Sequence, residues 1–133
     1  MTGLSHMTFI VKDLNKTEAM LVKLLGARKI YQSDDHHYSI AEERFYVAKG
    51  MWIAIMQGEP LPSKTYNHVA FKIEEDAIDP CLEHLEDLGL EILPGRTRIT
   101  GEGHSIYFYD YDNHLFELHT GTLEQRLETY AVA

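Results

Sequence analysis

The feature of this sequence that most constrains its fold is an internal repeat. Two stretches, "SHMTFIVKDLNKTEAMLVKLLGA" and "NHVAFKIEEDAIDPCLEHLEDLGLE", share one layout with little identity. Each has a His entering a short strand-like run, then an acidic turn, a stretch of helical apolar spacing and a Gly. His6 lies 20 residues before Gly26, and His68 lies 21 residues before Gly89. The sequence therefore predicts two copies of one folding unit.

Three strand-like segments follow each predicted helix, separated by Gly, Asp, Asn and Pro. They lie near 28–32, 37–48 and 51–57 in the first half, and near 90–93, 97–110 and 114–119 in the second. Gly26 and Gly89 are expected as helix C-caps. The predicted fold class is α+β, built from two βαβββ modules.

The expected organisation is one domain without a flexible linker or low-complexity segment. It comprises residues 1–133, with module one at 1–58, module two at 65–121 and a C-terminal helix at 122–130. "EPLPSK", 59–64, is the expected connector between the modules. Thr122, with Gln125 three residues later, predicts a capping box at the start of the last helix.

Composition narrows the possible partners and compartments. The 133 residues suffice for a core without disulfides, and Cys81, the only cysteine, is expected to be structural in a reducing compartment. No apolar run approaches the ~18 residues of a membrane span, and no signal peptide is evident. We therefore expect a cytoplasmic protein. A net charge of −9 with scattered Lys and Arg argues against nucleic acid and leaves a small ligand or another protein as partner.

Strand alternation sorts the polar side chains onto one face of each predicted strand. His6 shares a face with Thr8, and His68 shares a face with Ala70. Glu117, between Phe116 and Leu118, shares a face with His119. An unpaired carboxylate in such surroundings costs several kcal/mol, so it needs a partner.

Two imidazoles and one carboxylate make a divalent metal site with open positions. The ligand hypothesis is His6, His68 and Glu117. The alternative, a surface or hydrogen-bonded His at a strand head, is the commoner case for a single His, but both His residues hold the same place in the repeat. Superposing the halves by the His-to-His offset of 62 puts Ile55 opposite Glu117. The first half would then lack a carboxylate, leaving three protein ligands and room for a substrate.

The paired modules with His, His and Glu resemble the vicinal oxygen chelate superfamily of glyoxalase I, extradiol dioxygenases, bleomycin-binding proteins and fosfomycin-resistance enzymes. The resemblance covers nearly the entire chain. Four segments are most similar to the epoxide-hydrolysing fosfomycin-resistance branch commonly called FosX: "GLSHMTFIVKDL", "SIAEERFYV", "YNHVAFKI" and "GEGHSIYFYDYDNHLFELHTGTLEQRL".

This resemblance implies opening of the oxirane ring of fosfomycin, a phosphonate antibiotic, with a divalent metal, most often Mn²⁺. The metal would be held by His6, His68 and Glu117, the set already reached from strand alternation, and would polarise the oxirane oxygen. The motif match implies that Glu43 is the general base for water. Glu42 beside it would face the other way, and the alternative interpretation is an ordinary exposed acidic pair.

Further residues match substrate-contacting positions of the family. Arg126 would bind the phosphonate, unless it is only a solvated helix charge. The other substrate candidates are Thr8, Tyr66, Tyr107 and Arg98, while Trp52 could line the pocket or the core. The loop "TGEGHS" resembles a monovalent-cation loop of the thiol-transferring branch, but Gly101 stands where that branch carries a Ser. His119 shares the Glu117 face and could hydrogen-bond near the metal, whereas His104 and His114 are unassigned.

The resemblance also implies a homodimer, with His6 of one copy meeting His68 and Glu117 of the other in a module-swapped arrangement. The expected function is therefore a Mn²⁺-dependent fosfomycin epoxide hydrolase. Three alternatives remain open: a thiol transferase that adds glutathione or a similar thiol, a non-catalytic drug-binding protein, and a ferrous dioxygenase.

Overall fold

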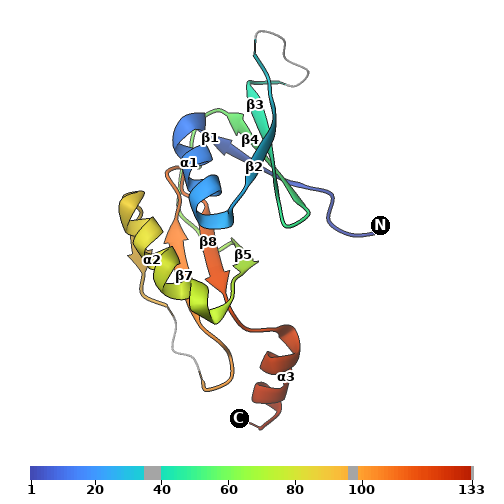
Figure 1. The fold of residues 1–133 in the computed structure, drawn as a ribbon, viewed down its shortest axis with the longest axis vertical. Helices are drawn as coiled ribbons and strands as arrows, with labels where there is room; N and C mark the ends of the chain where they lie inside the picture. The colour runs from blue at the N-terminus through green and yellow to red at the C-terminus, as the bar shows by residue number, and fades with distance from the viewer. Residues whose placement is uncertain (35–39, 96–98, 133) are drawn as a thin grey trace. The chain divides into compact units, whose positions relative to one another are not determined.

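A computed structural model describes residues 1–34, 40–95 and 99–132 of the chain. The chain divides into two compact units. The first unit is Met1–Ser63 with Tyr111–Asn113, and the second is Lys64–Asp110 with His114–Ala133. The boundary after Ser63 lies inside the predicted connector, and each unit contains one copy of the repeat (Figure 1).

The first unit is a four-stranded sheet with one helix. Its elements are β1 (Met7–Val11), α1 (Leu14–Leu25), β2 (Arg28–Gln32), β3 (Glu43–Ala48) and β4 (Met51–Gln57). The strand order is β1-β4-β3-β2, with β1 parallel to β4 and the other neighbours antiparallel.

The second unit repeats this topology. Its elements are β5 (His68–Lys72), the 3₁₀ turn η1 (Glu75–Ala77), α2 (Ile78–Asp87), β6 (Ile92–Leu93), β7 (Ser105–Tyr109) and β8 (Leu115–His119). The order is β5-β8-β7-β6, again with one parallel pair, β5 and β8. The predicted α+β fold of two βαβββ modules is confirmed.

Each helix buries one apolar stripe, as the sequence spacing predicts. In α1 the buried residues include Met20 and Leu21, and in α2 they are Cys81 and Leu85. Burial raises the pKa of the Cys81 thiol, in keeping with a structural role. The strand residues that complete the two cores are Val11, Tyr46, Ala48, Ile53 and Ile55 in the first unit, and Phe71, Ile106, Phe108, Phe116 and Leu118 in the second.

The opposite side of each sheet, called here the second face, carries the predicted site residues. It comprises Thr8, Glu43, Phe45, Trp52 and Ala54 in the first unit, and Ala70, Ser105, Tyr107, Leu115 and Glu117 in the second. Strand alternation makes the second face distinct from the core face that packs on the helix. The repeat thus places equivalent side chains on equivalent faces.

The ladder register corrects one prediction about this repeat. Thr8 pairs with Ala54 on β4, and the equivalent Ala70 pairs with Glu117 on β8. The first-unit counterpart of Glu117 is therefore Ala54, and the alignment with Ile55 was wrong. The second half holds one more residue between its first and last strands, and a one-residue slip exchanges the two faces of a strand. Ile55 lies fully buried in the core instead.

Two predicted strands are shorter than expected. The segment 37–48 becomes a strand only from Glu43, with 35–39 outside the described residues. The segment 97–110 becomes a strand only from Ser105, and 96–98 likewise lie outside the description. Gly101 and Gly103 have φ of 99° and 85°, a left-handed backbone that interrupts an extended strand.

One of the two predicted helix C-caps is confirmed, and the other is displaced by one residue. Gly26 caps α1 in the left-handed conformation, with φ of 62°. Gly89, with φ of 70°, lies one residue beyond Leu88, the C-cap of α2. The capping box at Thr122 forms in full, because its hydroxyl accepts from the Gln125 amide while the Gln125 side chain accepts from the Thr122 amide.

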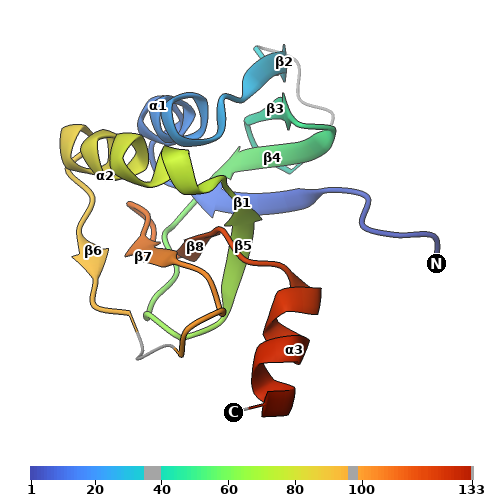
Figure 2. The same cartoon turned by 60° about the horizontal axis from the view of Figure 1, so that its bottom comes forward.

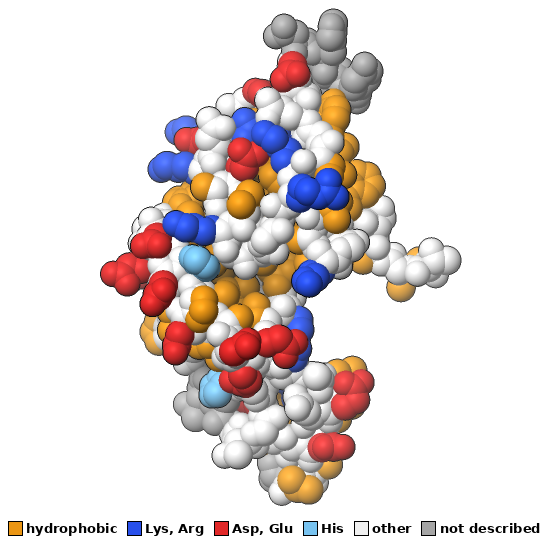
Figure 3. Space-filling model, viewed as in Figure 1, with side chains coloured by type: hydrophobic (Ala, Val, Ile, Leu, Met, Phe, Trp, Pro, Cys, Tyr) orange, Lys and Arg blue, Asp and Glu red, His pale blue; other side chains and the backbone are white. Residues whose placement is uncertain are grey.

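The last helix, α3 (Leu123–Val132), continues from β8 and extends away from the strands of its own unit (Figure 2). None of its described residues is buried, and Leu123 and Leu127 expose 65% and 58% of their surface. On the face drawn in Figure 3, acidic side chains lie over α2 and α3. No helix among the described residues has the length and apolar character needed to cross a bilayer.

Candidate metal and substrate site

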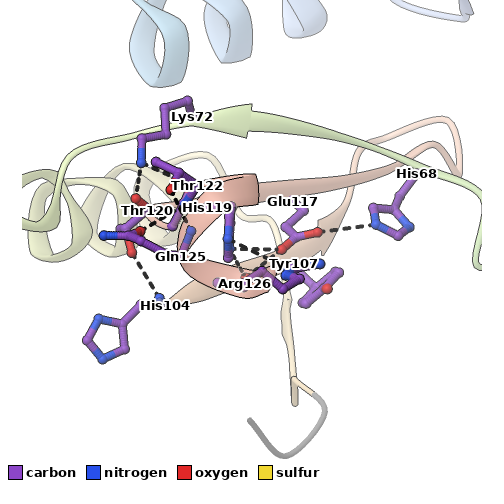
Figure 4. A network of polar contacts seen from close by, with 12 residues as sticks. His68, Lys72, His104, Tyr107, Glu117, His119, Thr120, Thr122, Gln125 and Arg126 are labelled. Atoms are coloured by element: carbon purple, nitrogen blue, oxygen red, sulfur yellow. Dashed lines mark hydrogen bonds and ion pairs between the residues drawn. The ribbon is translucent and has the colours of Figure 1, made fainter. Parts of the chain in front are cut away.

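The second unit brings His68 and Glu117 together on its second face. β8 is a central strand, flanked by β5 and β7, and Glu117 on it is buried, with only 4% of the residue exposed. Its Oε1 lies 3.2 Å from Nε2 of His68, the first residue of β5. Two of the three predicted metal ligands therefore meet, and Figure 4 shows the contact.

The hydrogen bond at Nδ1 of His68 decides where the ring carries its proton, and so whether Nε2, the nitrogen near Glu117, can act as an acceptor. Nδ1 lies 2.7 Å from the Tyr66 carbonyl oxygen. A carbonyl only accepts, so Nδ1 carries the proton, and in neutral imidazole Nε2 then presents a lone pair. A divalent cation bound by that lone pair would also lie beside Glu117 Oε1, and a backbone partner on the other ring nitrogen is typical of metal-ligating His.

The other oxygen of Glu117 is held by protein groups. The Ser105 hydroxyl donates to Oε2, and Nδ1 of His119 lies 2.7 Å from the same hydroxyl oxygen. Nη2 of Arg126 lies 3.4 Å from Nε2 of His119. The two carboxylate oxygens thus have different surroundings, and only Oε1 faces His68.

Two predicted substrate residues surround His68. Tyr66 and Tyr107 have hydroxyl oxygens 3.4 Å apart, and their ring centroids lie 5.0 Å and 5.6 Å from that of His68. Tyr107 is buried on β7 directly opposite Glu117, whereas Tyr66 is exposed. Both could present hydroxyl groups to a ligand at this point.

A cavity of about 320 Å³ opens beside the pair. It is lined by His68, Ala70, Glu117, His119, Gly121, Thr122, Leu123 and Arg126. The cavity brings the guanidinium of the predicted phosphonate-binding Arg126 to the same hollow as the carboxylate. A small anionic molecule that also contacts a metal fits this combination of charges.

The first unit places three other predicted residues on its own second face. His6 precedes β1 and stacks on Trp52, with ring centroids 4.2 Å apart, and its Nδ1 hydrogen-bonds the Ser5 hydroxyl at 2.9 Å. Thr8 is exposed on the same face. Glu43, the first residue of β3, is 7% exposed there, and its backbone N–H donates to the Ser33 hydroxyl at 2.9 Å.

Glu42 points to a different place, as strand alternation predicts. It lines a separate hollow of the first unit together with Arg44. Arg44 lies under α1, where Nη2 donates to Asn15 at 2.9 Å and Nη1 lies 3.5 Å from Glu18. The hydrogen bond from Tyr46 lowers the pKa of Glu18 below its ordinary value. The two neighbouring acids therefore occupy different environments.

One predicted substrate residue, Arg98, lies outside the described residues, whereas His104 and His114 are described. Among the residues that are described, no three His, Cys, Asp or Glu side chains form a ready metal cluster within the chain. His114 hydrogen-bonds Asp110 at 2.8 Å in the β7–β8 turn. His104 donates to Glu75, and this hydrogen bond, followed by that from Thr120, lowers the Glu75 pKa.

The predicted departure at Gly101 has a structural reason. Its φ of 99° disfavours any side chain, and an added Cβ would lie 2.4 Å from the Thr129 hydroxyl of α3. Beside this loop, Lys72 donates through Nζ to the carbonyl oxygens of Thr120 and Gly121. The Lys72 ammonium therefore donates to both carbonyl oxygens at the β8–α3 junction (Figure 4).

Comparison with known proteins decides the family. A model described as the glyoxalase/bleomycin resistance protein/dioxygenase superfamily matches residues 3–118. Over 129 residues the chain is 54% identical to the fosfomycin resistance protein FosX of Listeria innocua, covering 97% of both chains. The chain belongs to this superfamily and, within it, to the fosfomycin resistance proteins.

The chain is also similar to two further proteins of this family, whose names state a bound ligand or an activity of their own. A crystal structure of mutant FosX from Listeria monocytogenes, complexed with Mn(II) and 1S,2S-dihydroxypropylphosphonic acid, has a TM-score of 0.89 at 52% identity and covers 98% of both chains. The metallothiol transferase FosB of Staphylococcus saprophyticus is 36% identical over 132 residues, covering 96% of this chain and 83% of FosB.

Sequence reasoning missed one residue of the site, Ser105. Alternation places it on the face of Tyr107, and this much was readable in "SIYFY". Its contact with Glu117 and His119 depends on the antiparallel register of β7 and β8, in which Ser105 pairs with His119. That register follows from the turn at 110–114 and was not predicted.

Proposed function

We propose that this protein is a Mn²⁺-dependent fosfomycin resistance enzyme that hydrolyses the oxirane ring of fosfomycin to a diol. The observation that carries the proposal is the facing pair of His68 Nε2 and Glu117 Oε1, 3.2 Å apart beside a cavity lined by Arg126. Its support from relatives is the FosX structure that holds Mn(II) together with a dihydroxypropylphosphonic acid.

The residues present fit a divalent metal. An imidazole nitrogen, His68 Nε2, and a carboxylate oxygen, Glu117 Oε1, are both common ligands of divalent metals, so at 3.2 Å from each other they suit one cation of borderline to hard character. We propose His6 as the third protein ligand, by its equivalence to His68 in the repeat. When bound, the ion supplies a Lewis acid for the oxirane and phosphonate oxygens.

The chain's own residues then divide the remaining work. Glu43 accepts a proton from water as the water oxygen bonds to an oxirane carbon and the C–O bond of the ring breaks. The ring oxygen then takes a proton from solvent and Glu43 returns its proton to solvent, so that one water is added overall to give the diol. Thr8 donates a hydrogen bond to the oxirane oxygen. Arg126 binds phosphonate oxygens through its planar fork. Tyr66 and Tyr107 complete the phosphonate contacts, and Arg98, outside the described residues, stays a predicted contact.

Burial of Glu43 suits this role, because a base in a dry surrounding is shielded from competing hydrogen bonds of bulk water. The alternative on the same scaffold is thiol transfer, and its support is the 36% identity to a metallothiol transferase. That reaction needs a thiol in place of water as the nucleophile and yields an adduct.

The two chemistries differ in their products, and this gives the test. Purified protein with Mn²⁺ and fosfomycin, but without thiol, is expected to yield dihydroxypropylphosphonic acid. Proton and phosphorus NMR measure its formation. Parallel samples contain glutathione, cysteine or bacillithiol, with product masses measured by mass spectrometry. Diol in all samples supports the hydrolase, whereas consumption only with thiol and appearance of an adduct would replace it by a transferase. Binding without turnover would indicate a sequestering protein.

We further propose a homodimer in which the metal site is shared, with His6 from one subunit and His68 and Glu117 from the other. The exposed apolar residues of α3, Leu123 and Leu127, together with Trp52 on the second face of the first unit, are surfaces that a second copy would cover. Closed twofold assemblies are the commonest oligomers of soluble chains.

Mixed dimers test this sharing. His6→Ala and Glu117→Ala subunits are each expected to be inactive alone, because every site in such a dimer lacks one ligand. In a shared-site heterodimer one site carries both changes and the other carries none. Random assembly should therefore recover about a quarter of wild-type activity after refolding the two variants together. No recovery, with heterodimers demonstrated by native mass spectrometry, would show that each subunit supplies all its ligands.

A further inference from the structure

A chain of hydrogen bonds links Arg126 to Glu117 across the floor of the site. Nη2 of Arg126 lies 3.4 Å from His119 Nε2, His119 Nδ1 lies 2.7 Å from the Ser105 hydroxyl oxygen, and that hydroxyl donates to Glu117 Oε2. Figure 4 shows Glu117, His119 and Arg126 close to one another. The carboxylate end of this chain is the oxygen that does not face His68.

Donor and acceptor roles along the chain have one consistent direction. A guanidinium only donates, so His119 accepts at Nε2 and carries its proton on Nδ1. That N–H donates to the Ser105 oxygen, which frees the single hydroxyl proton for Glu117. Every donor points toward the carboxylate, and aligned hydrogen bonds of this kind polarise one another.

The local backbone is built to allow this approach. Ser105 pairs with His119 across the β7–β8 ladder, so their side chains lie on one face as direct neighbours. Gly121 leaves the space into which His119 extends, because a Cβ there would lie 2.8 Å from Nε2 and 2.6 Å from the Glu102 carbonyl oxygen. Glu117 itself is buried, with 4% of its surface exposed.

We propose that Ser105, oriented by His119, is a positioning residue that holds Glu117 as a one-oxygen metal ligand. With Oε2 hydrogen-bonded to the hydroxyl, Oε1 is the oxygen on the His68 side, and a coordination position that a two-oxygen carboxylate would fill stays open for substrate. This inference rests on the proposed function, and it assigns to Ser105 and His119 roles that act through Glu117.

These hydrogen bonds also connect the substrate-binding residue Arg126 to the proposed metal ligand Glu117. Arg126 is the proposed phosphonate contact and at the same time the first donor of the chain. A phosphonate that aligns its guanidinium would strengthen the donation to His119 and thereby to Ser105. Binding of the anion and binding of the metal should therefore favour each other.

The test measures Mn²⁺ binding to the full-length protein by titration calorimetry and by Mn²⁺ electron paramagnetic resonance. Loss of an outer hydrogen-bond partner typically weakens metal affinity 10–100-fold, so Ser105→Ala should raise the Kd for Mn²⁺ by about tenfold or more. Ser105→Thr keeps the hydroxyl and should restore most of the affinity. Ser63→Ala, at an exposed serine of the connector, is the matched control and should leave the Kd unchanged.

Two variants of His119 separate orientation from packing. His119→Asn places an amide N–H near the position of Nδ1 and should keep the donation to Ser105, whereas His119→Ala should behave like Ser105→Ala. A positioning role also predicts a kinetic split: at saturating Mn²⁺, Ser105→Ala should still show a raised KM for fosfomycin, because Glu117 can then fill the position kept open for substrate. Circular dichroism establishes that each variant is folded.

Three results would overturn the inference. Unchanged Mn²⁺ affinity in folded Ser105→Ala would remove the role of the hydroxyl while leaving the proposed function intact. Equal weakening in Ser105→Thr and Ser105→Ala would assign the effect to packing. If wild-type protein bound no Mn²⁺ and left fosfomycin unchanged, the proposed function would fail, and this inference with it.

Discussion

Replacing Glu117 with Gln is expected to weaken Mn²⁺ binding by more than 100-fold, or about 2.8 kcal/mol at 1.4 kcal/mol per decade. The amide keeps the shape of the side chain but removes the charge, and it cannot accept on both atoms. A direct ligand should cost more than the 10–100-fold typical of outer partners. His68→Ala should have a comparable effect, because the Tyr66 carbonyl already orients the ring for Nε2 binding. Calorimetry with Mn²⁺ alone gives the affinities.

A matched histidine control is available on the other side of the same unit. His84 lies on α2, the helix of the core, and is not part of the second face. His84→Ala should leave the Mn²⁺ affinity at the wild-type value. Equal affinities for Glu117→Gln and wild type would remove Glu117 from the ligand set and leave the buried carboxylate without a metal to explain it.

Replacing Glu43 with Gln is expected to slow fosfomycin hydrolysis by about 10²–10⁴-fold, the range that a general base contributes, which is about 2.7–5.4 kcal/mol of barrier. Mn²⁺ affinity should stay at the wild-type value, because Glu43 is assigned to water and not to the metal. The measurement is diol formation under single-turnover conditions with saturating Mn²⁺.

Glu42→Gln is the natural control for this variant. The two acids are adjacent, but Glu42 lines the hollow shared with Arg44 while Glu43 lies on the second face. Glu42→Gln should hydrolyse fosfomycin at the wild-type rate. Full activity in Glu43→Gln, or the same loss in both variants, would reject Glu43 as the base.

Much of the fold could be predicted from the sequence because local signals agree with it. Apolar spacing placed both helices, Gly26 and Gly89 marked their ends, and Thr122 with Gln125 marked the start of the last one. These features depend on residues a few positions apart. The repeat then extended the local pattern to a topology, since one βαβββ unit fixed the expectation for the other.

Properties that depend on pairing between distant strands were harder to predict. The counterpart of Glu117 was placed at Ile55 instead of Ala54, because the two halves differ by one residue between paired strands. Strand starts were set too early where Gly101 and Gly103 turn the backbone. Ser105 was missed for the same reason, since its contacts follow from the β7–β8 register.

Alternation along a strand, a local rule, placed His68 and Glu117 each on the polar face of its own strand, and the need of a buried carboxylate for a partner suggested that they meet. The structure brings their Nε2 and Oε1 atoms to 3.2 Å. The assignments of His6, Thr8 and Glu43 remain predictions, although all three residues lie on the equivalent face of the first unit. Their common face is what the repeat leads one to expect of residues that serve one site.

The central claim is that two imidazoles and one carboxylate from opposite halves of the repeat hold a single ion. A crystal structure of the Mn²⁺-loaded protein, with anomalous diffraction collected on both sides of the manganese absorption edge, tests it most directly. We expect one anomalous peak for each subunit, within coordination distance of His6 Nε2, His68 Nε2 and Glu117 Oε1, with Glu117 Oε2 still hydrogen-bonded to Ser105. A peak elsewhere, or one that any of these three side chains fails to reach, would contradict it.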